Sequence, residues 1–222
     1  LYVLQKMVKT DKVVPTAIEF VDIAGLVKGA SKGEGLGNQF LANIRETDAI
    51  IEVVRCFDDP NTIHVTGKVD PIDDIETINT ELALADMASL EKRQQRLSKV
   101  AKTGDKDAVA ELAVVEKLLK LLEDGKFINV KDHFTEDELP YIKLMHLMTT
   151  KPVIYAANVS ETDLATGNDY VERVREYAKT HNADVVVISA KIEAELSELG
   201  DEEKKDYLAE LGVESSGIER MI

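Results

Sequence analysis

The residues of this chain best placed to do chemistry lie around Asp22. An apolar stretch, 18–23, carries this aspartate near its end, Gly25 follows three positions later, and further glycines continue to Gly37. An aspartate at the end of a strand can hold the water shell of a magnesium ion, and a neighbouring glycine amide can contact the γ-phosphate of a nucleotide. The pattern predicts a magnesium and phosphate site, although Asp-x-x-Gly alone is also typical of a strand ending in a turn.

The residue after this glycine bears on how water would be activated. Many switch-type nucleotide hydrolases carry a glutamine there, which orients the attacking water, and Leu26 cannot do this. His64 is a candidate proton carrier, because an imidazole titrates near neutral pH. A single histidine in a loop is also commonly a solvated surface residue, and the sequence leaves both interpretations open.

A second polar motif, Asn158-Val159-Ser160-Glu161, follows an apolar stretch at 153–157. Guanine-specific hydrolases carry Asn-Lys-x-Asp at this place, where the aspartate accepts hydrogen bonds from the guanine ring. A longer glutamate that swings away would remove this guanine contact, while Asn158 can still pair with a purine N7. The motif predicts relaxed or adenine-preferring binding. The alternative is an ordinary polar turn.

A third motif, Ser189-Ala190-Lys191, follows the apolar stretch 185–188. Small residues let backbone amides approach the edge of a base, although this signal alone is very weak. Because ligands bind at the carboxyl ends of strands in open α/β sheets, we expect this motif, Asn158 and Asp22 to lie at one edge.

Composition limits the classes of function. The chain has 222 residues, a net charge of -15, no Trp and one Cys. This acidic balance gives no bulk attraction to DNA, RNA or anionic membranes, so we expect no DNA or membrane partner. One cysteine permits neither an internal disulfide nor a cysteine zinc site, which favours a cytoplasmic protein. No apolar run reaches the length of a transmembrane helix.

The pattern of apolar residues predicts α/β segments on both sides of a helical region. Strands are expected at 17–23, 49–57, 152–157 and 184–189, and helices at 1–9, 38–47, 168–181 and 202–211. The strand, helix, strand order implies parallel pairing.

Long helical patterns fill the middle of the chain. Apolar residues spaced three and four apart predict helices at 73–102 and 105–124, joined at Thr103-Gly104 as an antiparallel coiled-coil hairpin, and a third helix at 136–149. We therefore divide the chain into a first α/β part, 1–72, a helical insertion, 73–149, and a second α/β part, 150–222. Basic residues near the hairpin tip suggest an RNA or protein contact, or else a solvated face; they are Lys92, Arg93, Arg96, Lys99, Lys102 and Lys106.

The chain resembles the YchF/Obg-like ATPase family in five segments, which are Glu19–Leu41, Asn43–Asp48, Val53–Phe57, Ile78–Asp86 and Asn158–Glu161. The resemblance covers essentially the whole chain. It implies a P-loop NTPase fold of the G-domain type with a parallel sheet and an inserted helical hairpin. It also implies an ATPase that binds GTP more weakly and associates with the ribosome or a ribosomal subunit, with a hydrophobic residue, here Leu26, replacing the catalytic glutamine.

The family's motifs place some site residues and leave others out. Asp22 would act on Mg²⁺ through water, Gly25 would sense the γ-phosphate, and the base site would comprise Asn158, Val159, Glu161, Ser189 and Ala190. No Gly-x-x-x-x-Gly-Lys-Ser/Thr loop is present, and the family's C-terminal TGS domain would follow residue 222. We therefore expect the chain to be part of a longer protein and to be inactive by itself. The alternative function is a ribosome- or protein-binding module in which the helical hairpin acts and hydrolysis is slight or absent.

Overall fold

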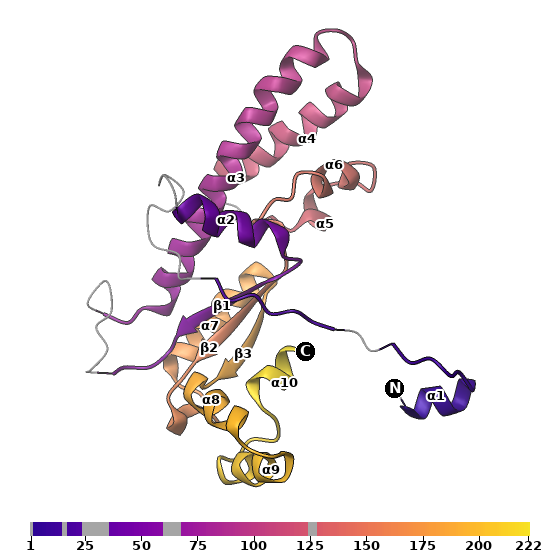
Figure 1. Ribbon diagram of the computed structural model, residues 1–222. Helices are drawn as coiled ribbons and strands as arrows, with labels where there is room; N and C mark the ends of the chain where they lie inside the picture. Colours follow the sequence, from indigo (N-terminus) through magenta and orange to yellow (C-terminus); the bar gives the residue numbers. More distant parts are fainter. Residues whose placement is uncertain (1, 15–16, 24–35, 60–67, 124–127) are drawn as a thin grey trace.

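A three-stranded parallel sheet forms the centre of the protein in a computed structural model that describes residues 2–14, 17–23, 36–59, 68–123 and 128–222 (Figure 1). The strands are β1 (Ile50–Arg55), β2 (Val153–Asn158) and β3 (Asp184–Ile188), in the order β1-β2-β3. In the register, Ile50 is opposite Val153 and Asn158 is opposite Ile188. The carboxyl ends of all three strands therefore meet at one edge, as the sequence predicts.

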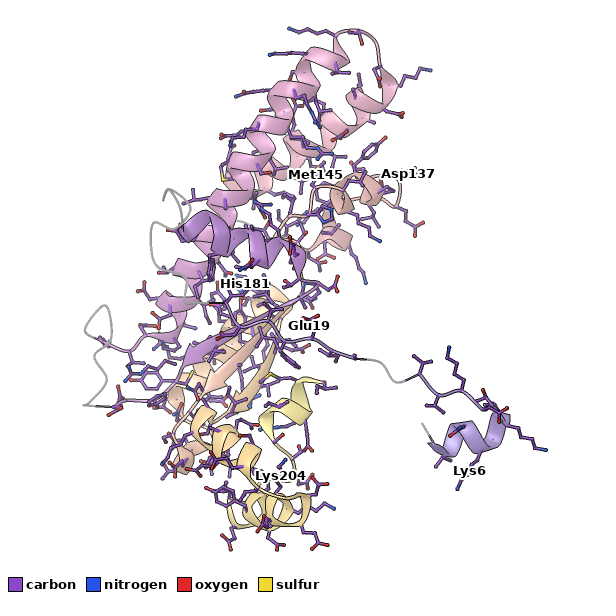
Figure 2. The ribbon with its side chains drawn as sticks, viewed as in Figure 1. Lys6, Glu19, Asp137, Met145, His181 and Lys204 are labelled. Atoms are coloured by element: carbon purple, nitrogen blue, oxygen red, sulfur yellow. The ribbon has the colours of Figure 1, made fainter. Side chains whose placement is uncertain are left out.

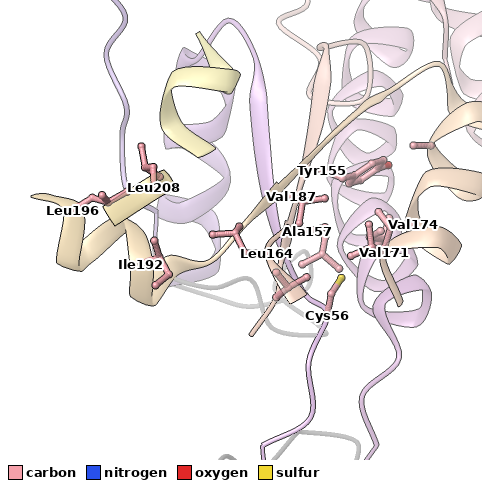
Figure 3. Packing of buried hydrophobic residues seen from close by; sticks show 14 residues of the cluster. Cys56, Tyr155, Ala157, Leu164, Val171, Val174, Val187, Ile192, Leu196 and Leu208 are labelled. Carbon is pink, nitrogen blue, oxygen red and sulfur yellow. The ribbon is translucent and has the colours of Figure 1, made fainter. Parts of the chain in front are cut away.

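Helices cover both faces of this sheet. Figure 3 shows Val171 and Val174 of α7 (Asp169–His181) on one side of the strands, and Ile192 and Leu196 of α8 (Ala190–Glu198) on the other. All four side chains are buried in one apolar cluster. Helices α9 (Asp201–Glu210) and α10 (Gly217–Met221) complete the C-terminal part, and α1 (Tyr2–Val8) begins the chain.

Local sequence sets the ends of these helices. The Asn168 side chain accepts a hydrogen bond from the Val171 amide at 3.1 Å and so caps the start of α7. Helix α3 (Pro71–Ala101) begins with proline after the capping residue Asp70, an arrangement that satisfies amides left free in the first turn. Gly104 adopts φ +86° between α3 and α4 (Lys106–Glu123), a conformation that glycine adopts without strain.

The predicted helical hairpin is present. Helices α3 and α4 pack along their apolar stripes, with Leu90, Leu97, Val115 and Leu118 buried in a second cluster. The segment that returns to β2 contains two short helices, α5 (Val130–His133) and α6 (Leu139–Lys143). Because α3 also contributes Ile75 to the cluster under the sheet, this single helix links the hairpin to the α/β core. The three-part division at residues 72 and 149 stays a prediction.

Helix α2 (Leu36–Glu46) lies against the lower part of α3. Leu41 and Ile44 pack with Leu82 of α3 and with Met148 in a third apolar cluster. Next to this cluster, the buried Asp86 carboxylate accepts hydrogen bonds from the backbone amide and hydroxyl of Thr149, both at 2.9 Å. Burial raises the pKa of Asp86, and its contacts with Thr149 and Arg45 oppose that shift.

Two predicted elements are wrong. Residues 17–23 have the composition of a strand but do not pair with any described residue, and a strand without a partner leaves its backbone groups to water. The helix predicted for 136–149 is limited to Leu139–Lys143. His146 adopts φ +50°, which a continuous right-handed helix cannot include, and the Thr149 amide bonds to Asp86 rather than within a helix.

The pattern of apolar residues also missed α5, α8 and α10. The acidic stretch 193–206 appears solvated by composition, yet Leu196 of α8 is buried within it. Within the described part of the chain, none of the helices has the length and apolar character needed to cross a membrane.

Candidate functional site

The structure brings together two of the predicted motifs at the carboxyl ends of β2 and β3. The Asn158 side-chain oxygen accepts a hydrogen bond from the Ala190 amide at 2.9 Å, and the Val159 amide donates to the Ile188 carbonyl at 2.8 Å. These two bonds hold the loop after β2 beside the end of β3 and the start of α8. Asn158 therefore has a structural role as well as its predicted role in binding.

These bonds decide which atoms remain for a ligand. The Ala190 amide is already bonded to Asn158, so only the exposed methyl group of Ala190 is available. Val159 is 2% exposed and packs in the core, so its side chain does not take the place of a lysine lying on a base. Ser189, also 2% exposed, precedes α8. For a purine edge, Asn158 keeps its Nδ2 as a donor and the second lone pair of its Oδ1 as an acceptor.

Glu161 forms an ion pair with Lys191 across this site. Glu161 begins a short 3-10 helix (Glu161–Asp163) after β2, and Lys191 lies in the first turn of α8. The hydrogen bond to Glu161 raises the pKa of Lys191. From the sequence, the longer glutamate is expected to turn away from a base. The residue that holds its carboxylate is Lys191, and no pattern in the sequence signals this pairing.

A network of polar side chains fixes the turn that carries Glu161. Asp163 accepts hydrogen bonds from Ser160 at 3.0 Å and from the Asn168 amide at 2.9 Å, and the same amide donates to the Cys56 carbonyl at 2.8 Å. Asn168 therefore connects the end of β1, the turn after β2 and the start of α7. Periodicity indicated Asn168 only as the beginning of a helix, and no pattern in the sequence signals its bond to Cys56.

Asp22 is exposed, and its neighbour Ile23 packs beside the α2 cluster. No described contact joins Asp22 to the Asn158 group. The other predicted residues of the switch, Gly25 and Leu26, and the candidate proton carrier His64 lie outside the described residues. Among the residues that are described, no group of three or more His, Cys, Asp or Glu side chains could hold a metal ion by itself.

Two titratable groups under the sheet lie apart from this site. Cys56 is fully buried, and burial raises the pKa of its thiol to about 12, so it remains a protonated thiol. Glu52 is 6% exposed, and burial, with a smaller contribution from the charge of Asp74, raises its pKa to about 8. The backbone amide of Cys56 donates to the Asn158 carbonyl at 2.8 Å, but no described contact joins the Cys56 thiol or the Glu52 carboxylate to the Asn158 side chain.

Three comparisons relate the chain to known proteins. A model of the 50S ribosome-binding GTPase family matches residues 5–93. Ribosome-binding ATPase YchF of Bacillus subtilis is 55% identical over 99% of this chain, and that of Escherichia coli O157:H7 is 53% identical over the same share; in each case 60% of the relative is covered. The solved structure of the Schizosaccharomyces pombe YchF GTPase matches with a TM-score of 0.79 and 36% identity, covering 96% of this chain and 59% of that one. The chain thus spans about 60% of the length of the curated relatives it matches.

Proposed function

Because the chain belongs to the YchF family and has its P-loop GTPase-like fold, we propose that the protein hydrolyses ATP to ADP and phosphate and acts as a nucleotide-dependent switch on the ribosome. The observation that carries this proposal is 55% identity to a ribosome-binding ATPase over 99% of the chain. Ribosome association further supports a cytoplasmic location. The geometry at the ends of β2 and β3 supports the proposal independently of the relatives' names.

The preference for adenine rests on the contact between Glu161 and Lys191. A guanine base offers ring and amine hydrogens that a free carboxylate would accept, and here the carboxylate is neutralised by a lysine. The Asn158 amide can still bind N7 of either purine and the adenine amine beside it. ATP is therefore bound in preference to GTP, with GTP bound more weakly rather than excluded.

The residues of this chain suit a magnesium ion that is held mainly by the nucleotide. Mg²⁺ in nucleotide sites keeps several waters and takes one or two carboxylates, together with phosphate oxygens. Asp22 is an exposed carboxylate in an extended segment and suits contact through water. A bound Mg²⁺ would neutralise charge that develops on the phosphates during hydrolysis.

Hydrolysis in this proposal is slow unless a partner contributes. Leu26 has no group that can orient water, and Gly25 would contact the γ-phosphate only through its amide. His64 would accept the proton of the attacking water. If a His64→Gln variant retained the wild-type rate of ATP hydrolysis, this role of His64 would be refuted.

The helical hairpin is the proposed contact with ribosomal RNA. Lys92, Arg96 and Lys99 are exposed along one side of α3 and have no ion-pair partner within the described ranges, whereas Arg93 forms an ion pair with Glu111. Lys92, Arg93 and Arg96 also line a hollow of about 310 Å³ with Leu90, Met145 and Leu147. Local positive charge on an acidic chain favours phosphate binding at this place. In a second candidate function, this hairpin is a binding module and the nucleotide site contributes little hydrolysis.

Titration of the full-length protein with fluorescently labelled ATP and GTP tests the nucleotide proposal. Tighter binding of ATP, with release of phosphate in the presence of Mg²⁺, is the expected result. Equal or tighter binding of GTP would refute the adenine preference. Ribosome binding with no measurable hydrolysis, even with ribosomes present, would favour the binding-module alternative.

A further inference from the structure

A cavity of about 290 Å³ lies between α3, α7 and the start of β2, which we call the α3–α7 cavity. Its wall includes Val153, the first residue of β2, whereas Asn158 at the proposed base site is the last. Five residue steps along a strand separate the two by about 16 Å. His181, labelled in Figure 2, lies at its edge, where the lower part of α3 meets the sheet. The cavity is therefore distinct from the nucleotide site.

One side of the cavity is apolar. The apolar residues that line it are Leu82, Leu122, Ile128 and Met148. All four side chains are buried and also belong to the apolar clusters described above. An engineered cavity of about 150 Å³ with a similar lining holds one benzene molecule. A cavity of about twice this volume has room for a two-ring body and a short side chain.

The rest of the lining is mostly polar and includes hydrogen-bond acceptors. Glu76 of α3 is exposed at the rim and lies close enough to Tyr177 for its charge to raise the pKa of that phenol, after the larger effect of burial. The Tyr177 ring stacks on the His181 ring with centroids 4.0 Å apart. A carboxylate beside the face of an aromatic pair is an environment that attracts an organic cation.

A buried polar group borders the same space. Asn79 lines the cavity, and its Nδ2 has no hydrogen-bond partner of good geometry among the described residues. The Asn79 side chain lies near the phenol oxygens of Tyr177 and of the fully buried Tyr155, where its hydrogen bonding lowers the pKa of each against the larger effect of burial. Buried polar atoms are normally satisfied by protein, water or ligand. Polar atoms of a bound molecule would satisfy them here.

We propose that the α3–α7 cavity binds a small aromatic amine, with its ring on Leu82, Ile128 and Met148 and its ammonium group facing Glu76 and Tyr177. The negative charge of Glu76 favours a cationic ligand and repels an anionic one, whereas the apolar lining does not distinguish charge. The volume of the cavity admits a molecule with one or two rings. Since α3 and α7 both pack on the sheet, such a ligand would bridge the hairpin base and the α/β core.

Tryptamine is the probe for this proposal. The chain contains no Trp, so the indole fluorescence of the probe can be followed without interference from the protein. We expect saturable binding of tryptamine that is at least about fivefold tighter than binding of uncharged 3-methylindole, with indole-3-acetate weaker still. Equal affinity for all three compounds, or no saturable binding of tryptamine, would overturn the proposal.

Variants assign the binding to this cavity. Glu76→Gln should weaken tryptamine binding by about two- to fivefold and reduce the preference over 3-methylindole. The matched control Glu91→Gln removes another exposed carboxylate of α3 and should leave binding unchanged. Ala83→Leu, which adds volume to the cavity wall, should abolish binding while circular dichroism shows a folded protein. Unchanged binding in Glu76→Gln, or displacement of tryptamine by ATP, would refute the assignment.

Discussion

The guanidinium of Arg45 lies 3.1 Å from the carboxylate of Asp86, joining α2 to α3. The Asp86 side chain has no exposed surface, whereas that of Arg45 is 26% exposed. Arg45 also donates to the carbonyl of Ala85, and its own carbonyl accepts from Lys151 at 3.1 Å. The buried Asp86 carboxylate therefore ties together α2, which follows the glycine-rich stretch 25–37, the base of the hairpin, and the segment around Thr149 that leads into β2.

Removing the cation from this pair should destabilise the protein. We expect Arg45→Met to lower the free energy of unfolding by about 2–3 kcal/mol, because it leaves the buried Asp86 carboxylate without its ion-pair partner. Asp86→Asn keeps an acceptor for Thr149 and should cost about 1–2 kcal/mol. Urea unfolding measures both. The exposed control Glu91→Gln should stay within about 0.5 kcal/mol, and a loss of that size in Arg45→Met would contradict the role given to the pair.

Glu52 makes stability depend on pH. The native state retains the Glu52 proton to about pH 8, whereas the unfolded chain releases it near the ordinary pKa of 4.5. The stabilising contribution is complete below about pH 4.5 and is lost as the pH rises through about 8. Urea unfolding should show that Glu52→Gln reduces this loss by an amount on the order of a few kcal/mol. Glu46→Gln, an exposed control at the end of α2, should keep the wild-type pH profile.

Close packing of α10 gives a test of the C-terminal fold. A Cβ atom added to Gly217 would lie 2.4 Å from Ile188 Cγ2 at the end of β3, whereas one added to Gly200 would meet only the flexible Glu203 side chain at 3.4 Å. We expect Gly217→Ala to destabilise the protein by about 1–3 kcal/mol through overpacking. Gly200→Ala, at the start of α9, serves as the matched control in thermal unfolding. Equal melting temperatures for Gly217→Ala and Gly200→Ala would show that α10 does not need the close approach to Ile188.

Sequence patterns predicted the elements whose local signals agree with their packing. Val54, Ala157 and Val187 of the three strands are buried as predicted, although Val53 of β1 is 62% exposed. Asn168 caps α7, and Gly104 turns between α3 and α4. The patterns failed where a distant partner decides the outcome. Residues 17–23 have strand composition but pair with no strand in the described part of the chain, and Glu52 and Asp86 are charged residues that tertiary contacts bury.

The sequence predicts where the residues of the candidate site lie, but not which hydrogen bonds and ion pairs they form. Asn158 and Ser189-Ala190 follow strands in the sequence, and parallel strands bring such ends together. The bond from the Ala190 amide to Asn158 and the ion pair between Glu161 and Lys191 depend on side-chain geometry across the loop. Neither has a signature in the spacing of the residues.

Lys191 should control the choice between purines. Lys191→Met removes the ammonium group and leaves the Glu161 carboxylate free to accept hydrogen bonds from a guanine ring. We expect the affinity for GTP relative to ATP to rise by about three- to tenfold in the full-length protein, measured by titration with labelled nucleotides. Lys205→Met, an exposed lysine of α9, is the control. An unchanged ratio in Lys191→Met would show that the ion pair does not set the preference.

The ion pair of Arg93 separates two interpretations of the basic residues on the hairpin. Lys92, Arg96 and Lys99 are exposed without a described ion-pair partner, so their replacement by glutamate should weaken sedimentation with ribosomes by at least about tenfold, and more at low salt. The charge of Arg93 is already neutralised by Glu111, so replacing both residues by glutamine leaves the local charge unchanged and should leave sedimentation near the wild-type level. ATP hydrolysis without ribosomes should be the same in all variants, because the substitutions lie on the hairpin. Full sedimentation of the triple variant would mean that these residues are a solvated face and that another surface binds the ribosome.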